Sequence, residues 1–301
     1  MWLELQIFGF RALWSPYYFV SLFIVGVLYY LIAVRYRKKF GGVDNPTFAQ
    51  IVNFYTALLL LYIVKGAPID LLSHIMLSAH MVQMVILYLV IPILLIRGLP
   101  YWLIEKTIEH HLIRPMFRFF TQPLIALALF NVLFAMYHVP AIFDFAKSSK
   151  IAHASIVTLL FVLAIFMWWP IVTPLKKYNR LNPLLKMAYL VASILIISIA
   201  CAMIIFAKDP LYDAYSASGA WIQSMSLCVP IDVLNGISGQ LTGAELFSPL
   251  STLEDQQLGG ILMMFLQQFI YGIIIARIFF SWFSDKNMTI DPLPTANERN
   301  E

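Results

Sequence analysis

The sequence predicts an all-α fold, a polytopic membrane bundle of seven transmembrane helices. Of its 301 residues, 61% are hydrophobic and only 12% are charged, whereas about a quarter of the residues in a soluble domain are charged. Seven stretches are apolar and long enough to cross about 30 Å of hydrocarbon, which takes roughly 20 helical residues. The connections between them alternate between rich and poor in Lys and Arg. We therefore expect residues 1–301 to form a single integral membrane domain.

The predicted spans follow from the apolar stretches taken in chain order. They cover about residues 14–34, 47–65, 70–96, 123–144, 152–173, 184–207 and 259–283. No basic segment precedes the first stretch, and it is too long for the apolar core of a signal peptide. We therefore expect it to be retained as a membrane span.

The distribution of Lys and Arg predicts the orientation of the bundle. The connections after the first, third, fifth and seventh spans contain most of these residues, namely Arg35, Arg37, Lys38, Lys39, Arg97, Lys106, Arg114, Arg118, Lys176, Lys177, Arg180, Lys186 and Lys286. Connections with an excess of basic residues face the cytoplasm. The N-terminus is therefore predicted to lie outside and the C-terminus, with the tail 285–301, in the cytoplasm. The net charge of +4 does not indicate a nucleic-acid partner.

Two connections are longer than simple loops. Residues 97–121 mix charged side chains with large apolar ones, which predicts an amphipathic segment on the inner membrane surface. His110 and His111 would be solvated there or would face the lipid headgroups. Residues 208–258 are rich in Ser, Gly, Tyr and Leu and too polar to span the membrane. We expect them to form an outer loop that folds back over the bundle.

The outer half of the predicted bundle contains most of the histidines. His74, His80, His138 and His153, four of the six, fall near the outer ends of spans 3, 4 and 5. Ionisable side chains inside membrane spans are costly and commonly functional. These four residues are therefore the first candidates for a site.

The start of span 7 brings further polar side chains to the same side. Asp255, Gln256 and Gln257 precede the span, and Gly259 and Gly260 follow them. Small residues at this point would let the helix approach its neighbours closely. The carboxylate and amides could orient ligands or contact a partner, or Asp255 could cap span 7.

Span 3 carries a stripe of possible metal ligands. Met76, His80 and Met84 are spaced at i, i+4 and i+8, so they share one helix face, with Gln83 beside them. Thioether sulfur suits Cu(I), and imidazole suits copper, iron or zinc. Alternatively, the methionines fill the core and the histidines hydrogen-bond neighbouring helices. The candidate metal ligands are His80, His138, His153, Met84 and His74, and the residues that could orient them or contact a partner are Gln83, Asp255, Gln256 and Gln257.

Four motifs carry a family resemblance. They are "AHMVQMVILYLVIPILLIRGLP", "YHVP", "MWWP" and "DQQLGG". Together they resemble the CtaG family, the multi-span assembly factors for caa3-type cytochrome c oxidase, over roughly residues 73 to 283. The resemblance implies a non-enzymatic protein of the bacterial cell membrane that is needed to form this active respiratory-chain oxidase. It also implies oxidase subunits as partners and copper handling as the proposed role in assembly.

The resemblance extends to single residues. His80, His138 and His153 match the family's histidine positions, and Asp255–Gln257 match its acidic and amide motif. Met84 stands where the family commonly has a second histidine, four residues after the first. This exchange keeps a possible ligand for Cu(I) but removes a His–His pair.

Several classes of function compete. The favoured one is a copper chaperone that binds copper weakly at the outer face and releases it to the oxidase. A haem-binding redox membrane protein would need two histidines on facing helices, such as His138 and His153. A scaffold for an oxidase subunit without metal, a transporter and a retinal-type receptor are further alternatives. A retinal Schiff base needs a lysine in span 7, and residues 259–283 contain none.

Overall fold

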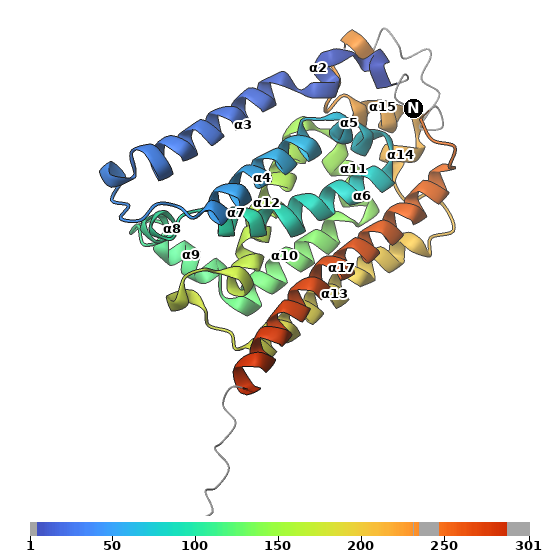
Figure 1. The fold of residues 1–301 in the computed structure, drawn as a ribbon. Coiled ribbons are helices and arrows are strands. Elements are labelled where there is room, and N and C mark those ends of the chain that lie inside the picture. The colour runs from blue at the N-terminus through green and yellow to red at the C-terminus, as the bar shows by residue number, and fades with distance from the viewer. Residues whose placement is uncertain (1–4, 231, 235–246, 288–301) are drawn as a thin grey trace, which may run out of the picture.

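The computed structural model describes residues 5–230, 232–234 and 247–287, and every regular element in these residues is a helix (Figure 1). The all-α prediction is confirmed for this part of the chain. Its candidate membrane spans number six, or seven if the pair Arg114–Phe120 and Pro123–Tyr137, bent by 72°, is one span. The six are Gln6–Arg35, Phe48–Lys65, Leu77–Gly98, Lys150–Val172, Pro183–Ile205 and Thr252–Ser284. Several such apolar helices suit a multi-pass membrane protein.

The N-terminal helices form a layer at one side of the bundle. Pro16 begins α3 directly after Ser15, which has a φ of 34°. The side chains of Thr47 and Gln50 form a capping box that fixes the start of α4. The elements of this N-terminal layer are the 3₁₀ turn Gln6–Phe8, α2 (Gly9–Trp14), α3 (Pro16–Tyr29), the π-helical turn Tyr30–Arg35, the 3₁₀ turn Arg37–Phe40 and α4 (Phe48–Lys65).

The third predicted span, residues 70–96, is not one continuous helix. Met76 is extended, with φ −130° and ψ 136°, and separates two helices. The expected stripe of Met76, His80 and Met84 is therefore wrong at its first member, and only His80 and Met84 share a helix. The span consists of α5 (Pro68–Ile75), α6 (Leu77–Val85), a π-helical turn (Ile86–Val90) and α7 (Ile91–Gly98).

Proline divides the segments on either side of the fourth span. The expected amphipathic segment at 97–121 forms two short helices rather than one. The span predicted at 123–144 ends at Tyr137, because Pro140 begins a new helix two residues after His138. The helices are α8 (Tyr101–Ile108), α9 (Arg114–Phe120), α10 (Pro123–Tyr137) and α11 (Pro140–Ser148).

The last spans are long helices joined by shorter elements. α17 begins seven residues before the predicted start of span 7 and continues to Asn287. Parts of the predicted loop 208–258 and of the predicted tail 285–301, namely 235–246 and 288–301, lie outside the described residues. The elements are α12 (Lys150–Val172), the 3₁₀ turn Lys176–Tyr178, α13 (Pro183–Ile205), α14 (Asp213–Ser216), α15 (Ser218–Met225) and α17 (Thr252–Asn287).

The helix α17 packs closely against both α13 and α6 (Figure 1). A Cβ atom on Gly259 would lie 3.1 Å from the backbone of Ser78 in α6, and one on Gly260 would lie 2.8 Å from Ile205 in α13. The prediction that this glycine pair permits close helix approach is confirmed. It also places the start of α17 beside the break in the third span.

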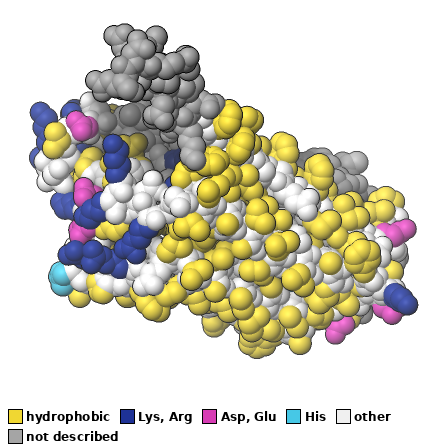
Figure 2. Space-filling view, turned by 90° about the horizontal axis from the view of Figure 1, so that it is seen from below, with side chains coloured by type: hydrophobic (Ala, Val, Ile, Leu, Met, Phe, Trp, Pro, Cys, Tyr) yellow, Lys and Arg dark blue, Asp and Glu magenta, His cyan; other side chains and the backbone are white. Residues whose placement is uncertain are grey.

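The two ends of the bundle differ in chemistry. Figure 2 shows apolar side chains over the middle of the molecule and Lys and Arg gathered at one end. We call this the basic end, where α8, α9 and the α12–α13 connection lie. The helices α5, α11, α14 and α15 lie at the opposite end (Figure 1). We call it the histidine end, because His74 in α5, His80 in α6, His138 after α10 and His153 in the first turn of α12 belong to this part of the fold.

Gly98 marks a close contact between α7 and α4. A Cβ atom at Gly98 would lie 2.6 Å from the backbone nitrogen of Phe54, which cannot swing aside. We expect Gly98→Ala to lower the free energy of unfolding by about 1–3 kcal/mol through overpacking. Thermal unfolding in detergent measures this. Gly272→Ala is the control, because its Cβ would meet nothing within 4 Å, and equal unfolding midpoints for the two variants would contradict the prediction.

Candidate functional site

The candidate site is built around the break between α5 and α6. The carbonyl oxygen of Ser73 accepts hydrogen bonds from the Tyr215 hydroxyl (2.6 Å) and the Lys147 ammonium (3.3 Å). The indole N–H of Trp221 donates to the carbonyl of Ile75 (3.3 Å). These donors come from α14, α11 and α15. Two helices of the predicted outer loop 208–258, α14 and α15, together with α11, therefore satisfy the carbonyl groups that the break exposes.

Asp255 accepts hydrogen bonds from the backbone N–H groups on the other side of the break. Its Oδ2 accepts hydrogen bonds from the backbone N–H groups of Leu77 (2.7 Å) and Ser78 (3.4 Å), and its Oδ1 accepts one from the Ser78 hydroxyl. A carboxylate at a helix N-terminus pairs with unsatisfied N–H groups and with the positive end of the helix dipole. Asp255 thus caps α6 from α17, rather than capping its own helix.

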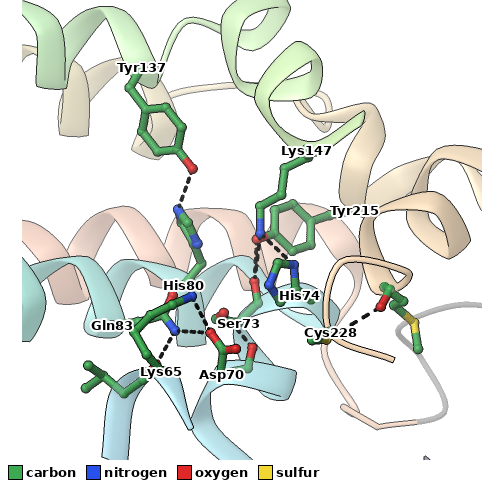
Figure 3. Close-up of polar contacts among 12 residues, drawn as sticks. Lys65, Asp70, Ser73, His74, His80, Gln83, Tyr137, Lys147, Tyr215 and Cys228 are labelled. Carbon is green, nitrogen blue, oxygen red and sulfur yellow. Dashed lines mark hydrogen bonds and ion pairs between the residues drawn. The ribbon is translucent and has the colours of Figure 1, made fainter. Parts of the chain in front are cut away.

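His80 and His138 lie on either side of Tyr137. The Nε2 of His80 lies 3.5 Å from the Tyr137 hydroxyl (Figure 3), and the Tyr137 and His138 ring centroids are 5.3 Å apart. The Nδ1 of His138 lies 2.8 Å from the carbonyl oxygen of Phe134. The Tyr212 hydroxyl donates to the His138 carbonyl (2.8 Å). Both imidazoles are fully buried.

His74 and His153 form a second pair. Their ring centroids are 5.3 Å apart, with the rings inclined at 61°. The Nδ1 of His74 lies 3.1 Å from the Nζ of Lys147, which Figure 3 shows directed at His74 and Ser73. The histidine end therefore holds two histidine pairs. The rings of His74 and His153 are in contact beside Lys147, whereas His80 and His138 each contact Tyr137.

The polar side chains that were predicted to lie beside the histidines form their hydrogen bonds with other groups. Gln83 donates to the carbonyl of Val64 and to Asp70 Oδ1 (2.8 Å), and Asp70 forms an ion pair with Lys65 (2.5 Å). Gln256 accepts from the backbone N–H of Leu211 (2.7 Å), and Gln257 donates to the carbonyl of Ala207 (3.1 Å). With Asp255, these side chains hold helix ends and loops in place, and none of their hydrogen bonds in the described residues reaches a histidine.

Three imidazoles leave one nitrogen each without a partner. The buried atoms His80 Nδ1, His138 Nε2 and His153 Nδ1 have no hydrogen-bond partner among the described residues. A buried polar atom without a partner costs free energy. Met84, fully buried on α6 one turn after His80, adds a thioether to the same end. These donors are of the types that suit copper.

The described residues do not assemble into a closed metal cage. No group of three or more His, Cys, Asp or Glu side chains in them is placed to hold an ion. His80, His138 and His153 therefore do not form a three-histidine group that could hold one ion in the described residues, and their role as ligands stays a prediction. The donors are distributed between two pairs because they project from α5, α6, the end of α10 and α12.

Lys147 is the residue that sequence analysis missed. No role was predicted for it, yet its side chain is buried, with 1% of its surface exposed. Its Nζ lies over the rings of Phe143 and Tyr215, at 5.7 and 5.4 Å from their centroids. Burial, with a smaller contribution from nearby Lys65, lowers the pKa of Lys147 to about 7. The i, i+4 spacing of Phe143 and Lys147 on one face of α11 is the sequence signal that could have revealed its burial.

Two cavities lie beside the histidine end. A cavity of about 470 Å³ is lined by His153, Lys65 and Tyr18, among others. A second, of about 510 Å³, is lined by Tyr18, Cys228 and Asp232. Both cavities are lined by Tyr18, and the first of them also brings open space to His153.

Comparison with known proteins gives one match. A family model described as cytochrome c oxidase caa3 assembly factor matches residues 27–285. Comparison with the curated proteins and with the solved structures gives no significant match. The matched region contains every candidate site residue, from His74 to Gln257.

Proposed function

This chain belongs to the family of caa3 cytochrome c oxidase assembly factors, and from that premise we propose that it receives copper at the histidine end and passes it to the oxidase during maturation. The partners in this proposal are oxidase subunits, and the copper is transferred at the outer face of the bacterial cell membrane. The protein binds and transfers an ion, so no enzymatic step is part of the proposal.

One observation carries the copper proposal: the buried ring nitrogens of His80, His138 and His153 that have no partner among the described residues. A buried imidazole normally uses both nitrogens, because an unpaired polar atom in an apolar surrounding costs about 1–3 kcal/mol. Three such atoms at one end of one bundle indicate a ligand that accepts imidazole. The Met84 thioether beside His80 favours Cu(I) over harder cations.

The distribution of these donors supports a cargo that is released. A closed cage of four ligands holds its ion as part of the fold, whereas an assembly factor must surrender it. Two histidine pairs provide more than one binding position, and the cavity lined by His153 provides open space beside one of them.

The proposed orientation rests on the basic end. Arg114, Arg118, Lys176 and Lys177 lie at the end opposite to the histidines, in the connections α8–α10 and α12–α13. The positive-inside rule places such connections in the cytoplasm. The histidine end would then face outward, on the side from which copper is supplied in this proposal.

A scaffold without metal is the second candidate. It is favoured by the finding that no group of three His, Cys, Asp or Glu side chains in the described residues can hold an ion. A scaffold would use the same polar network only to hold its own helices. The two candidates predict different results when methionine replaces a histidine. A copper site accepts a thioether in place of an imidazole, whereas a hydrogen-bonding scaffold does not.

The test compares two isosteric changes at His80. We expect His80→Leu to lower active caa3 oxidase in membranes by at least about tenfold, as loss of a metal-site residue commonly does. His80→Met should restore a substantial part of the activity, because its thioether still binds Cu(I). His138→Leu and His138→Met repeat the comparison. Oxidase activity, copper content of the oxidase and abundance of this protein are measured together.

One control variant and two contradicting outcomes complete this test. His111 is exposed at the basic end, so His111→Leu should leave oxidase activity unchanged. Equal loss with leucine and methionine at normal protein abundance would support the scaffold and remove copper from the proposal. Normal activity in all His80 and His138 variants would remove these residues from any role in assembly.

A further inference from the structure

Three cations surround one cavity at the basic end. Arg97 comes from α7, Lys186 from α13 and Arg277 from α17, and the cavity between them has a volume of about 430 Å³. The sequence positions are far apart, so only the fold brings these charges together. The cavity is at the opposite end of the bundle from the histidines and has no part in the proposed copper transfer.

The cations of this cavity lack acidic partners in the described part of the chain. Lys186 donates to the carbonyl oxygen of Ile171 at 3.3 Å, and Arg97 and Arg277 make no hydrogen bond or ion pair with any described residue. Two carboxylates at this end form ion pairs away from the cavity: Glu105 pairs with Lys177, and Glu109 pairs with Lys177 and Arg114. Three like charges around one cavity repel one another unless an anion joins them.

The walls and the rim of the cavity differ in polarity. Ile93, Ile274 and Ile278 form an apolar wall, and Asn179 and Ser281 supply polar groups. The start of α13 also lies at the cavity, so its helix dipole adds positive potential. Arg and Lys together with a helix N-terminus are the groups that proteins use to bind phosphate.

We propose that this cavity binds a phosphate group. Its lining combines isoleucines of the apolar helices α7 and α17 with the cations of the basic end. In a bilayer, such a boundary between apolar spans and basic residues lies at the level of the lipid headgroups. In a bilayer, the apolar wall of the cavity would contact the acyl chains of a bound lipid. The phosphate group therefore has two possible sources, an anionic phospholipid and free phosphate. Basic cavities between membrane helices on the cytoplasmic side recognise such headgroups.

The experiment uses the full-length protein purified in a nonionic detergent. Mixed micelles containing phosphatidylglycerol are compared with micelles containing phosphatidylcholine, and sodium phosphate is compared with sodium chloride at equal ionic strength. Ligand affinity is obtained from the shift of the thermal unfolding midpoint as each ligand is titrated. We expect phosphatidylglycerol to raise the midpoint and phosphatidylcholine to leave it unchanged.

Variants locate the binding site. Arg97→Gln and Arg277→Gln should each weaken the affinity about fivefold, since each basic residue at an anionic lipid surface contributes on the order of 1 kcal/mol. Lys176→Gln is the matched control, because Lys176 is an exposed cation of the same end that does not line the cavity. It should bind as the unmodified protein does.

Each outcome decides the proposal. A response to phosphatidylglycerol alone, lost in the cavity variants, supports a lipid headgroup as the source. A response to both phosphatidylglycerol and inorganic phosphate supports a site for the phosphate group itself. No response of the unmodified protein to either ligand overturns the proposal, as does an equal loss of affinity in Lys176→Gln and the cavity variants.

Discussion

Replacing Asp255 by alanine is expected to lower the free energy of unfolding by about 3 kcal/mol, because buried hydrogen bonds to a charged acceptor are lost and their donors stay buried. The backbone N–H groups of Leu77 and Ser78 and the Ser78 hydroxyl would all lose their acceptor. The first turn of α6 would then loosen, and His80 lies in that helix. We therefore also expect active caa3 oxidase to fall to near background.

Two comparisons isolate the capping role of Asp255. Asp255→Asn keeps one carbonyl oxygen as an acceptor but loses the charge, so its unfolding free energy should lie between those of the alanine variant and the unmodified protein. Glu254→Ala removes an exposed carboxylate one residue earlier, which bonds only to Ser251, and should cost less than about 1 kcal/mol. Equal thermal unfolding midpoints for Asp255→Ala and Glu254→Ala would contradict the cap.

The length of the apolar stretches in the sequence predicted the bounds of three helices. The expected spans 47–65, 152–173 and 184–207 correspond to α4, α12 and α13 within two residues at each end. This succeeds because a membrane span requires a single local property, a continuous apolar stretch of sufficient length. The gathering of His74, His80, His138 and His153 at one end followed from the same argument, since span order and direction fix the depth of each residue.

The break at Met76 could not be predicted in the same way. The residues around it contain no proline or glycine, the usual causes of a kink. The break is stabilised instead by groups distant in sequence: Asp255 on one side, and Tyr215 and Trp221 on the other. Such tertiary contacts are absent from a periodicity argument, so the stripe of three ligands on span 3 was only partly correct.

The hydrogen bonds of the candidate site depend on the same long-range contacts. The spacing of Asp255, Gln256 and Gln257 indicated a polar cluster at the start of span 7, but their partners are the backbone of α6 and of the segment after α13. Sequence analysis identified which residues are polar and at what depth they lie. Which group each one bonds is determined by packing of helices that are far apart along the chain.

Replacing Lys147 by methionine is expected to remove most of the increase in stability with pH between 7.5 and 9. Burial lowers the pKa of Lys147 to about 7 in the folded protein, whereas it is about 10.4 in an unfolded chain. Between these values the unfolded chain binds a proton that the folded protein does not, so the free energy of unfolding rises with pH. The rise amounts to about 1.4 kcal/mol per pH unit, or roughly 2 kcal/mol over this range.

The measurement is the free energy of unfolding in detergent micelles at pH 7.5, 8, 8.5 and 9. Methionine is unbranched like lysine and one atom shorter, so it keeps most of the packing on Phe143 and Tyr215 but has no group that titrates. Lys150→Met is the matched control, because Lys150 is exposed at the start of α12, and it should keep the slope of the unmodified protein. Burial raises the pKa of the Cys228 thiol to about 12, which opposes the rise equally in all three proteins, so the difference between Lys147→Met and Lys150→Met isolates the buried amine. Identical slopes would contradict the lowered pKa of Lys147, because they would mean that this residue is protonated in the folded protein throughout the range.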